Sequence, residues 1–154
     1  MPVLCGPFTS YRTKVLYSLP SRADSLAGME IGRAQVAIVD DDPSVGRALG
    51  RLVRSLGMQS ATFTSGEEFF RAVAASWKPD CVVLDVQMPE MNGLEVQQQI
   101  VELEFAVPVI FITAHEDRGV AERVIAAGAV GLLYKPFDDE SLKELICHAL
   151  EIET

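Results

Sequence analysis

Cysteine is scarce in this 154-residue chain, and its three copies lie far apart without any CxxC spacing. Such a set supports neither a disulfide framework nor a zinc site, so we expect a reducing compartment, the cytoplasm. Basic residues are also few, because 13 Lys and Arg stand against 22 Asp and Glu, giving a net charge of -9. The chain therefore lacks the basic surface of a nucleic-acid binder, and we expect no direct nucleic-acid binding.

Long apolar runs are absent as well. The longest strongly apolar stretch, AVPVIFITA at residues 106–114, is too short to span a bilayer, so we expect no membrane partner. No glycine-rich phosphate loop appears, since GAVG at residues 128–131 does not match GxxxxGK[ST]. No His/Ser or Cys/His pair indicates acyl transfer. With 49% hydrophobic residues, the chain has enough apolar side chains for the core of one ordinary domain.

The first 34 residues differ from the rest of the chain. They carry four basic residues against two acidic ones, a net charge of +2, which leaves -11 for the remainder. They show no sustained helical or alternating period, and they are rich in Pro and Gly. We expect residues 1–34 to be a disordered N-terminal extension. The alternatives are a transit peptide, or sequence included by a start codon upstream of Met29.

From Gln35 onward, short apolar runs alternate with longer stretches of helical period. The runs are QVAIVD, SATFT, CVVLD, PVIFIT and GLLYK. A helix starting at Pro43 has Asp42 as its N-cap, and a second helix begins at Ser65 with Glu68 at capping-box spacing. Further helices are expected at residues 93–102, at residues 118–127 and after residue 139. Five strands alternating with five helices predict an α/β fold with a doubly wound parallel sheet covered on both faces.

Polar side chains stand where four of these strands end. The first strand ends at Asp40 and Asp41, the third at Asp85, the fourth at Thr113 and the fifth at Lys135. Parallel strands share a direction, so all four endings meet at one edge of the sheet, where such folds bind their ligands. Each residue alone has an ordinary explanation as a cap, a turn or a surface group, but their joint occurrence predicts a site.

Three crowded carboxylates would repel one another unless a cation neutralises them. Oxygen ligands suit a hard divalent ion, and Mg²⁺ fits best because it combines a few carboxylates with water or phosphoryl oxygens. A carboxylate beside Mg²⁺ and a lysine is arranged to attack phosphorus and form an aspartyl phosphate. The sequence therefore predicts phosphoryl chemistry at this edge.

The motifs VDDDP, LDVQMPEMNGLE, ITAH and YKPF, in this order, resemble the receiver domains of two-component response regulators. The resemblance covers residues 35 to about 152, predicts a receiver domain over residues 35–154, and implies the flavodoxin-like (βα)5 fold with strand order 2-1-3-4-5. It implies that Asp85 is the phospho-acceptor, that Thr113 and Lys135 contact the phosphoryl group, and that the Lys135–Pro136 peptide is cis. It also implies that Mg²⁺ is held by Asp40, Asp41, Asp85 and the backbone carbonyl of Gln87, with Asp42 mainly a helix cap.

The ending AGAVGLLYKPF is most similar to FixJ-type receivers, which dimerise on phosphorylation through the fourth helix and fifth strand. One residue departs from the pattern: the family usually has Tyr or Phe three residues before the lysine, and here Leu132 stands there. We expect strand alternation to place Tyr134 on the other face, so that it does not replace that aromatic. The resemblance assigns Gln87 and His115 to positions that modulate the lifetime of the acyl phosphate, although a plain loop role for His115 is equally compatible.

The resemblance implies a phosphorelay receiver that takes its phosphoryl group from a histidine kinase or a histidine phosphotransfer protein and forms a phosphorylation-dependent homodimer or binds partners. It implies no enzyme activity beyond self-phosphorylation and autodephosphorylation. Two alternatives remain: a haloacid-dehalogenase-like Mg²⁺ phosphohydrolase, or a degenerate receiver acting only as an interaction module. Because the chain ends at EIET without a helix-turn-helix, we expect a stand-alone receiver rather than a fragment.

Overall fold

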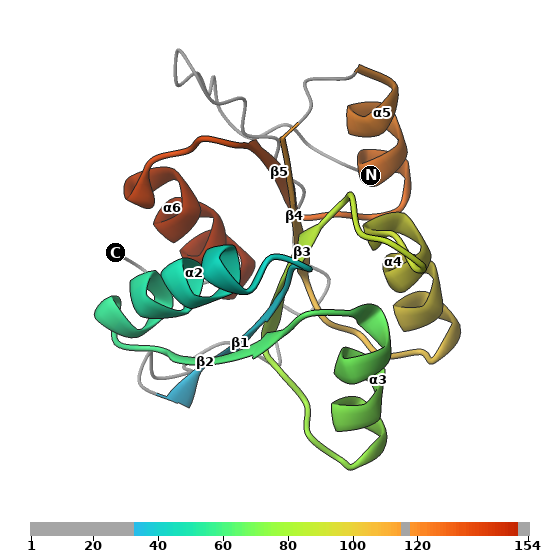
Figure 1. Cartoon of the computed structure of the whole chain (residues 1–154), viewed down its shortest axis with the longest axis horizontal. Helices are drawn as coiled ribbons and strands as arrows, with labels where there is room; N and C mark the ends of the chain where they lie inside the picture. Colours follow the sequence, from blue (N-terminus) through green and yellow to red (C-terminus); the bar gives the residue numbers. More distant parts are fainter. Residues whose placement is uncertain (1–32, 115–117, 151–154) are drawn as a thin grey trace.

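The computed structural model describes residues 33–114 and 118–150 and shows alternating strands and helices (Figure 1). The elements are β1 (Gln35–Val39), α2 (Pro43–Ser55), β2 (Gln59–Phe63), α3 (Gly66–Ala74), β3 (Cys81–Asp85), α4 (Gly93–Glu102), β4 (Val109–Thr113), α5 (Arg118–Ala126), β5 (Gly131–Tyr134) and α6 (Asp139–Leu150). The five predicted strands and five predicted helices are confirmed. The helix predicted at residues 118–127 ends one residue earlier, at Ala126.

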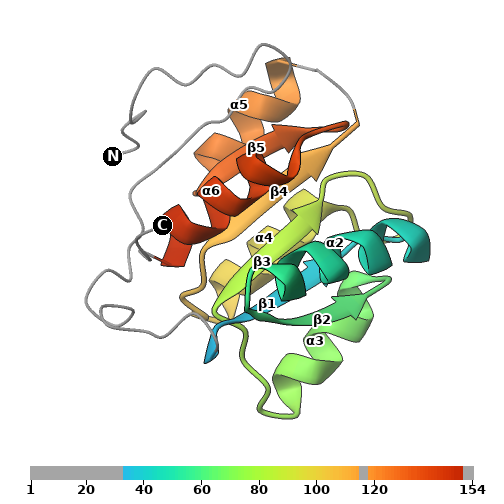
Figure 2. The same ribbon diagram turned by 90° about the vertical axis from the view of Figure 1, so that its left-hand side faces the viewer.

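The five strands form one parallel sheet with the order β2-β1-β3-β4-β5, which confirms the predicted order (Figure 2). The chain runs outward from β1 to β2 and then returns to the other side of β1 for β3. Val36 consequently has a partner on each side, Ser60 in β2 and Cys81 in β3. This reversal makes the carboxyl ends of β1 and β3 the switch point of the sheet, where loops diverge and leave room for a site.

Two apolar layers flank the sheet. Helices α2 and α6 cover one face, and α3, α4 and α5 cover the other (Figure 1). Successive strand residues alternate between the two layers, so that Ile38 packs with α2 and α6 while Ala37 and Val39 pack on the opposite face. Strands β3, β4 and β5 are buried along their whole length, whereas the edge strand β2 is half-buried. The core therefore fixes which strand ends meet.

The N-caps of α2 and α3 are those that the sequence predicts, but the predicted capping box of α3 is not formed. Asp42 caps α2 and Ser65 caps α3, as predicted. The Glu68 side chain accepts from the Thr64 amide rather than from that of Ser65, so the predicted reciprocal box is not closed. The complete capping box lies at α4, between Asn92 and Glu95, and it fixes the loop that follows β3.

Within the described residues, no helix combines the length and the apolar character needed to cross a membrane. Cys81 and Cys147 are buried free thiols, and burial raises the pKa of Cys81 to about 12. Cys81 is therefore an inert core residue on β3, as its apolar sequence context predicts.

Candidate functional site

Three carboxylates converge at the switch point of the sheet. Asp40 follows β1, Asp85 ends the adjacent strand β3, and Asp41 begins the loop to α2. One ligand oxygen from each lies within 4.8 Å of the other two. Asp40 and Asp85 are almost completely buried, at 1% and 6% exposure, while Asp41 faces solvent. The cluster thus has two oxygens within the protein and one at its mouth.

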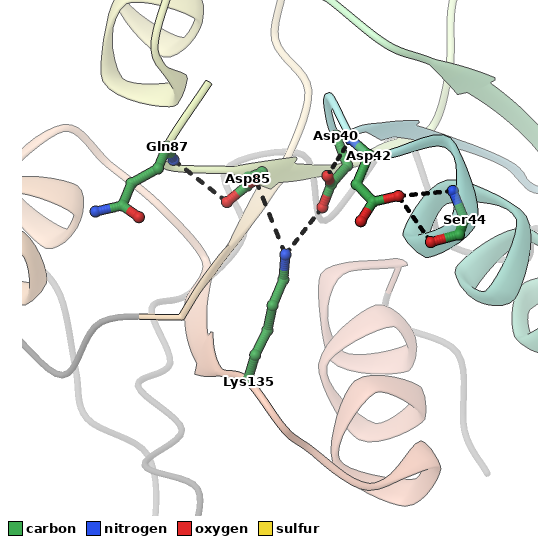
Figure 3. A network of polar contacts seen from close by, with 6 residues as sticks. All are labelled: Asp40, Asp42, Ser44, Asp85, Gln87 and Lys135. Carbon is green, nitrogen blue, oxygen red and sulfur yellow. Dashed lines mark hydrogen bonds and ion pairs between the residues drawn. The ribbon is translucent and has the colours of Figure 1, made fainter. Parts of the chain in front are cut away.

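Lys135, directly after β5, supplies the positive charge of this cluster. Its Nζ lies 3.0 Å from Oδ2 of Asp40 and 3.8 Å from Oδ2 of Asp85, between the two strand ends (Figure 3). The side chain is only 25% exposed, so solvent screens these pairs less than it would screen a surface ion pair. The peptide between Lys135 and Pro136 is cis, as the family resemblance implied.

Asp40 and Asp42 have different partners although they are two residues apart. Asp40 Oδ1 accepts from the backbone amide of Asp42 at 2.9 Å, which together with Lys135 fixes the orientation of the Asp40 carboxylate. Asp42 Oδ1 instead accepts from the Ser44 amide at 2.9 Å and from the Ser44 hydroxyl at 2.7 Å. These bonds, the hydroxyl bond first, lower the pKa of Asp42. Asp42 is therefore a helix cap and lies outside the carboxylate cluster, as predicted.

Asp85 is the carboxylate that the fold disfavours most when it is ionised. Burial raises the pKa of Asp85 to about 6, and the charge on Asp40 adds to this rise. Lys135 and the backbone amide of Gln87, which donates to Asp85 Oδ1 at 3.2 Å, partly oppose it. A carboxylate in these surroundings is ionised at neutral pH, and its ionised form would be stabilised by a nearby cation.

The other predicted site residues are Thr113, Gln87 and His115. Thr113 ends β4 and is fully buried, and its carbonyl accepts from the Lys135 amide at 2.8 Å. Gln87 is exposed, and Figure 3 shows its side chain directed away from Asp85, so only its backbone faces the cluster. His115 lies outside the described residues.

The expectation that Tyr134 lies on the other face from Leu132 is wrong. Residues two apart in a strand share a face, and both side chains are buried in the layer that packs against α3, α4 and α5. Tyr134 is also the register partner of Thr113 on β4, so the two residues are neighbours across the strands. An aromatic residue thus does lie next to the threonine, two residues further along β5 than Leu132, whose register partner is Phe111.

The predictions from sequence did not include two of the contacts that shape the site. The Ser44 hydroxyl holds Asp42, and a hydroxyl two residues after an Asp cap is the sequence signal for such a bond. Gly93, the first residue of α4, is constrained by its close approach to the end of β3. A Cβ on Gly93 would lie 2.3 Å from the Asp85 carbonyl oxygen, so any side chain would displace the end of β3.

The donor set fits a hard divalent cation. Three carboxylates with oxygens within 4.8 Å of one another match the all-oxygen ligands that Mg²⁺ prefers, and no sulfur or imidazole ligand is part of the group. Three carboxylates stand against the single Lys135 ammonium that pairs with two of them, which leaves net negative charge at the cluster. The cluster therefore has both the ligand type and the excess charge of a magnesium site.

Comparison with known proteins agrees with this geometry. Residues 36–147 match the family of response regulator receiver domains. The response regulator protein TodT of Pseudomonas putida is 44% identical over 117 residues, which cover 76% of this chain and 51% of TodT. Nodulation protein W of Bradyrhizobium diazoefficiens is 38% identical over 122 residues, covering 77% of this chain and 52% of that protein. The chain thus spans about half the length of these curated relatives.

Solved structures give the same result. A response regulator receiver protein from Burkholderia phymatum has 52% identity and a TM-score of 0.73, with coverage of 79% of this chain and 98% of that one. The structure of FixJ-N has 32% identity and a TM-score of 0.71, covering 79% of this chain and 96% of FixJ-N. With the strand order, the carboxylate cluster and these matches together, the chain belongs to the response regulator receiver family of two-component systems.

Proposed function

We propose that this chain accepts a phosphoryl group on Asp85 and relays it as a conformational signal. The observation that carries the proposal is the convergence of Asp40, Asp41 and Asp85 with Lys135 at one edge of the sheet. The donor is a histidine kinase or a histidine phosphotransfer protein, in keeping with the family. Residues 35–154 form the receiver domain in this proposal, and residues 1–34 are an extension outside it.

In the transfer step, a carboxylate oxygen of Asp85 attacks the phosphorus of a phosphohistidine. The O–P bond forms as the P–N bond breaks, and the leaving imidazole keeps the electron pair. With a pKa of about 6, Asp85 is ionised at neutral pH and available as the nucleophile. The Lys135 ammonium is placed to stabilise the phosphoryl oxygens, and we assign the same role to the Thr113 hydroxyl.

We assign Mg²⁺ to Asp40, Asp41, Asp85 and the Gln87 backbone carbonyl. When bound, the ion supplies positive charge that offsets the charge of the phosphoryl oxygens. The chain has no conventional enzyme activity in this proposal, because the phosphoryl group ends on its own aspartate and leaves by autodephosphorylation. The buried free thiols Cys81 and Cys147 are compatible with the reducing cytoplasm where we place the reaction.

Phosphorylation then shifts an equilibrium of the face formed by α5, β5 and α6, and this face forms a homodimer or binds another protein. Thr113, the residue assigned to sense the phosphoryl group, is bonded through its backbone to Lys135 at the end of β5. Tyr134 is the register partner of Thr113, so a buried aromatic residue of β5 lies next to the threonine across the two strands.

The test is phosphorylation by acetyl phosphate with Mg²⁺, followed by intact mass spectrometry. We expect the wild-type chain to gain the mass of one phosphoryl group, which EDTA prevents. Asp85→Asn is expected to fold and gain nothing, whereas the matched variant Asp42→Asn is phosphorylated normally because Asp42 is a cap outside the cluster. An unmodified wild-type chain under these conditions would refute the proposal. Steady release of product from an aryl phosphate would instead support the phosphohydrolase.

A further inference from the structure

Gln97 is a buried amide on a helix that is otherwise apolar on its inner side. It lies in the middle of α4 and is 5% exposed, in the layer shared by α3, α4 and α5. Its Nε2 donates to the carbonyl oxygen of Ala127 at 3.0 Å, thirty residues away in the sequence. Its Oε1 is buried and finds no protein donor among the described residues. An aliphatic side chain would pack here without leaving an amide oxygen unpaired, so the choice of Gln is unexplained by packing.

The bond from Gln97 falls on the carboxyl end of α5. Gly128, with φ +92°, donates to Ile125, and Ala129 donates to Val124, so these amides close the last turn of the helix. Such an ending leaves further carbonyls without a partner inside the helix. Gln97 satisfies the one at Ala127 from a neighbouring helix, and it thereby ties the end of α5 to α4.

A surface pocket lies beside the amino-terminal half of α5. Its volume is about 460 Å³, and it lies between α5, the start of α4 and the loop after β3. The pocket is lined by Val86, Gln87, Met88, Pro89, Asn92, Leu94, Val120 and Arg123. Four of these residues, at positions 86–89, follow Asp85 directly, so the pocket lies at the end of α5 near the carboxylate cluster, whereas Gln97 bonds the far end. Both helices lie on the same face of the sheet (Figure 1).

We infer that Gln97 is a positioning residue that restrains α5 in the arrangement of the unphosphorylated chain. This inference rests on the proposed function, in which α5 belongs to the face that switches. The Gln97–Ala127 bond stabilises the resting arrangement, and the pocket beside Val120 gives the other end of α5 room to shift.

The test compares full-length wild type with Gln97→Leu, Gln97→Met and the matched control Gln98→Leu. Gln98 is the next residue on α4; it is exposed and its side chain donates to Glu102 on the same helix at 3.4 Å, so it reports the cost of a Gln-to-Leu change without the restraint. Loss of one net hydrogen bond, about 1 kcal/mol, corresponds to a factor of about five. We therefore expect Gln97→Leu and Gln97→Met to be phosphorylated by acetyl phosphate about fivefold faster than wild type, with Gln98→Leu unchanged.

A second measurement does not depend on phosphorylation. In the unphosphorylated protein, hydrogen exchange of the Gly128 and Ala129 amides is expected to accelerate about fivefold in both Gln97 variants, relative to Gln98→Leu. The melting temperatures of the Gln97 variants should differ little from that of wild type, since each substitution removes the unpaired oxygen along with the bond. A purely structural role of Gln97 would instead lower the melting temperature and accelerate hydrogen exchange throughout the protein.

The outcomes separate the two proposals. If wild type is not phosphorylated on Asp85, the proposed function fails while hydrogen exchange still tests the restraint. If wild type is phosphorylated and the Gln97 variants match Gln98→Leu in both rate and exchange, the restraint is overturned. Should Gln97→Leu fold poorly, Gln97→Met decides the question, because its flexible side chain fills a similar volume.

Discussion

Replacing Asp85 by Asn should stabilise the metal-free protein at neutral pH. The side chain of Asp85 is 8% exposed, and its carboxylate lies close to Asp40. Burial and the Asp40 charge raise the pKa of Asp85 from 3.8 to about 6, despite the opposing effect of Lys135 at 3.8 Å. The ionised carboxylate is thus less stable in the folded chain than in the unfolded chain, and Asn keeps the shape while removing the charge.

The expected gain in stability follows from the pKa of Asp85. Because this pKa rises from 3.8 to about 6 on folding, the folding free energies of the ionised and the protonated form differ by about 3 kcal/mol. Burying the Asn amide takes back part of this gain, so we expect Asp85→Asn to raise the free energy of unfolding by about 2 kcal/mol at pH 7.5. For a domain of this size, that is about 6–10 °C in melting temperature.

The stability of the wild-type protein should depend on pH. Because the folded chain has the higher pKa, it holds the proton more tightly than the unfolded chain. The stabilisation from that proton is complete below about pH 3.8 in wild type and is lost as the pH rises through about 6. The advantage of Asp85→Asn should therefore be largest above pH 7 and fall below about 1 kcal/mol at pH 4.5.

The assay is urea unfolding followed by circular dichroism at pH 7.5 and pH 4.5, in EDTA to remove divalent ions. Asp41→Asn is the matched control, because Asp41 is exposed and its neutralisation should change stability by at most about 0.5 kcal/mol. A destabilised Asp85→Asn protein at pH 7.5, or a gain of equal size at both pH values, would refute the electrostatic account of this cluster.

Three further predictions concern the same site. Mg²⁺ should bind wild type in a calorimetric titration and raise its melting temperature, with a stabilisation of about 1.4 kcal/mol at a free Mg²⁺ concentration of ten times the Kd. Asp40→Asn should lose this binding, and Asp42→Asn should keep it. Lys135→Met should cost about 2 kcal/mol in EDTA, because Asp40 then stays buried without its cation, and urea unfolding should show Mg²⁺ restoring most of the loss. Gly93→Ala should cost about 2 kcal/mol or more and slow phosphorylation by acetyl phosphate, since its Cβ would lie 2.3 Å from the Asp85 carbonyl oxygen; wild-type stability and rate in this variant would contradict the close packing.

The sequence predicted the fold well because its local signals are strong and agree with one another. Apolar runs such as CVVLD and PVIFIT are buried on both faces, and Asp42 followed by Pro43 marks a helix start without help from the rest of the chain. The capping boxes were less predictable. Glu68 lies at the right spacing from Ser65, yet its carboxylate bonds to Thr64, because the loop geometry decides which amide is within reach.

The face assignment of Tyr134 failed for a different reason. The period of a strand is two, so Leu132 and Tyr134 must share a face, and the structure places both in the layer under α5. No sequence pattern could have shown that the register of β4 and β5 also sets Tyr134 beside Thr113. Register depends on how whole strands pack against their helices.

By itself, the sequence determined the strand endings and therefore which polar residues share one edge of the sheet, since parallel strands deliver their carboxyl ends to the same side. Tertiary structure decided what those residues do to one another. It buried Asp40 and Asp85, kept Asp41 in solvent, turned Asp42 toward Ser44 and placed Lys135 between two strand ends. It also joined Gln97 to Ala127 across two helices. Distances and burial of this kind depend on packing between segments far apart in the chain, where local propensity carries no information.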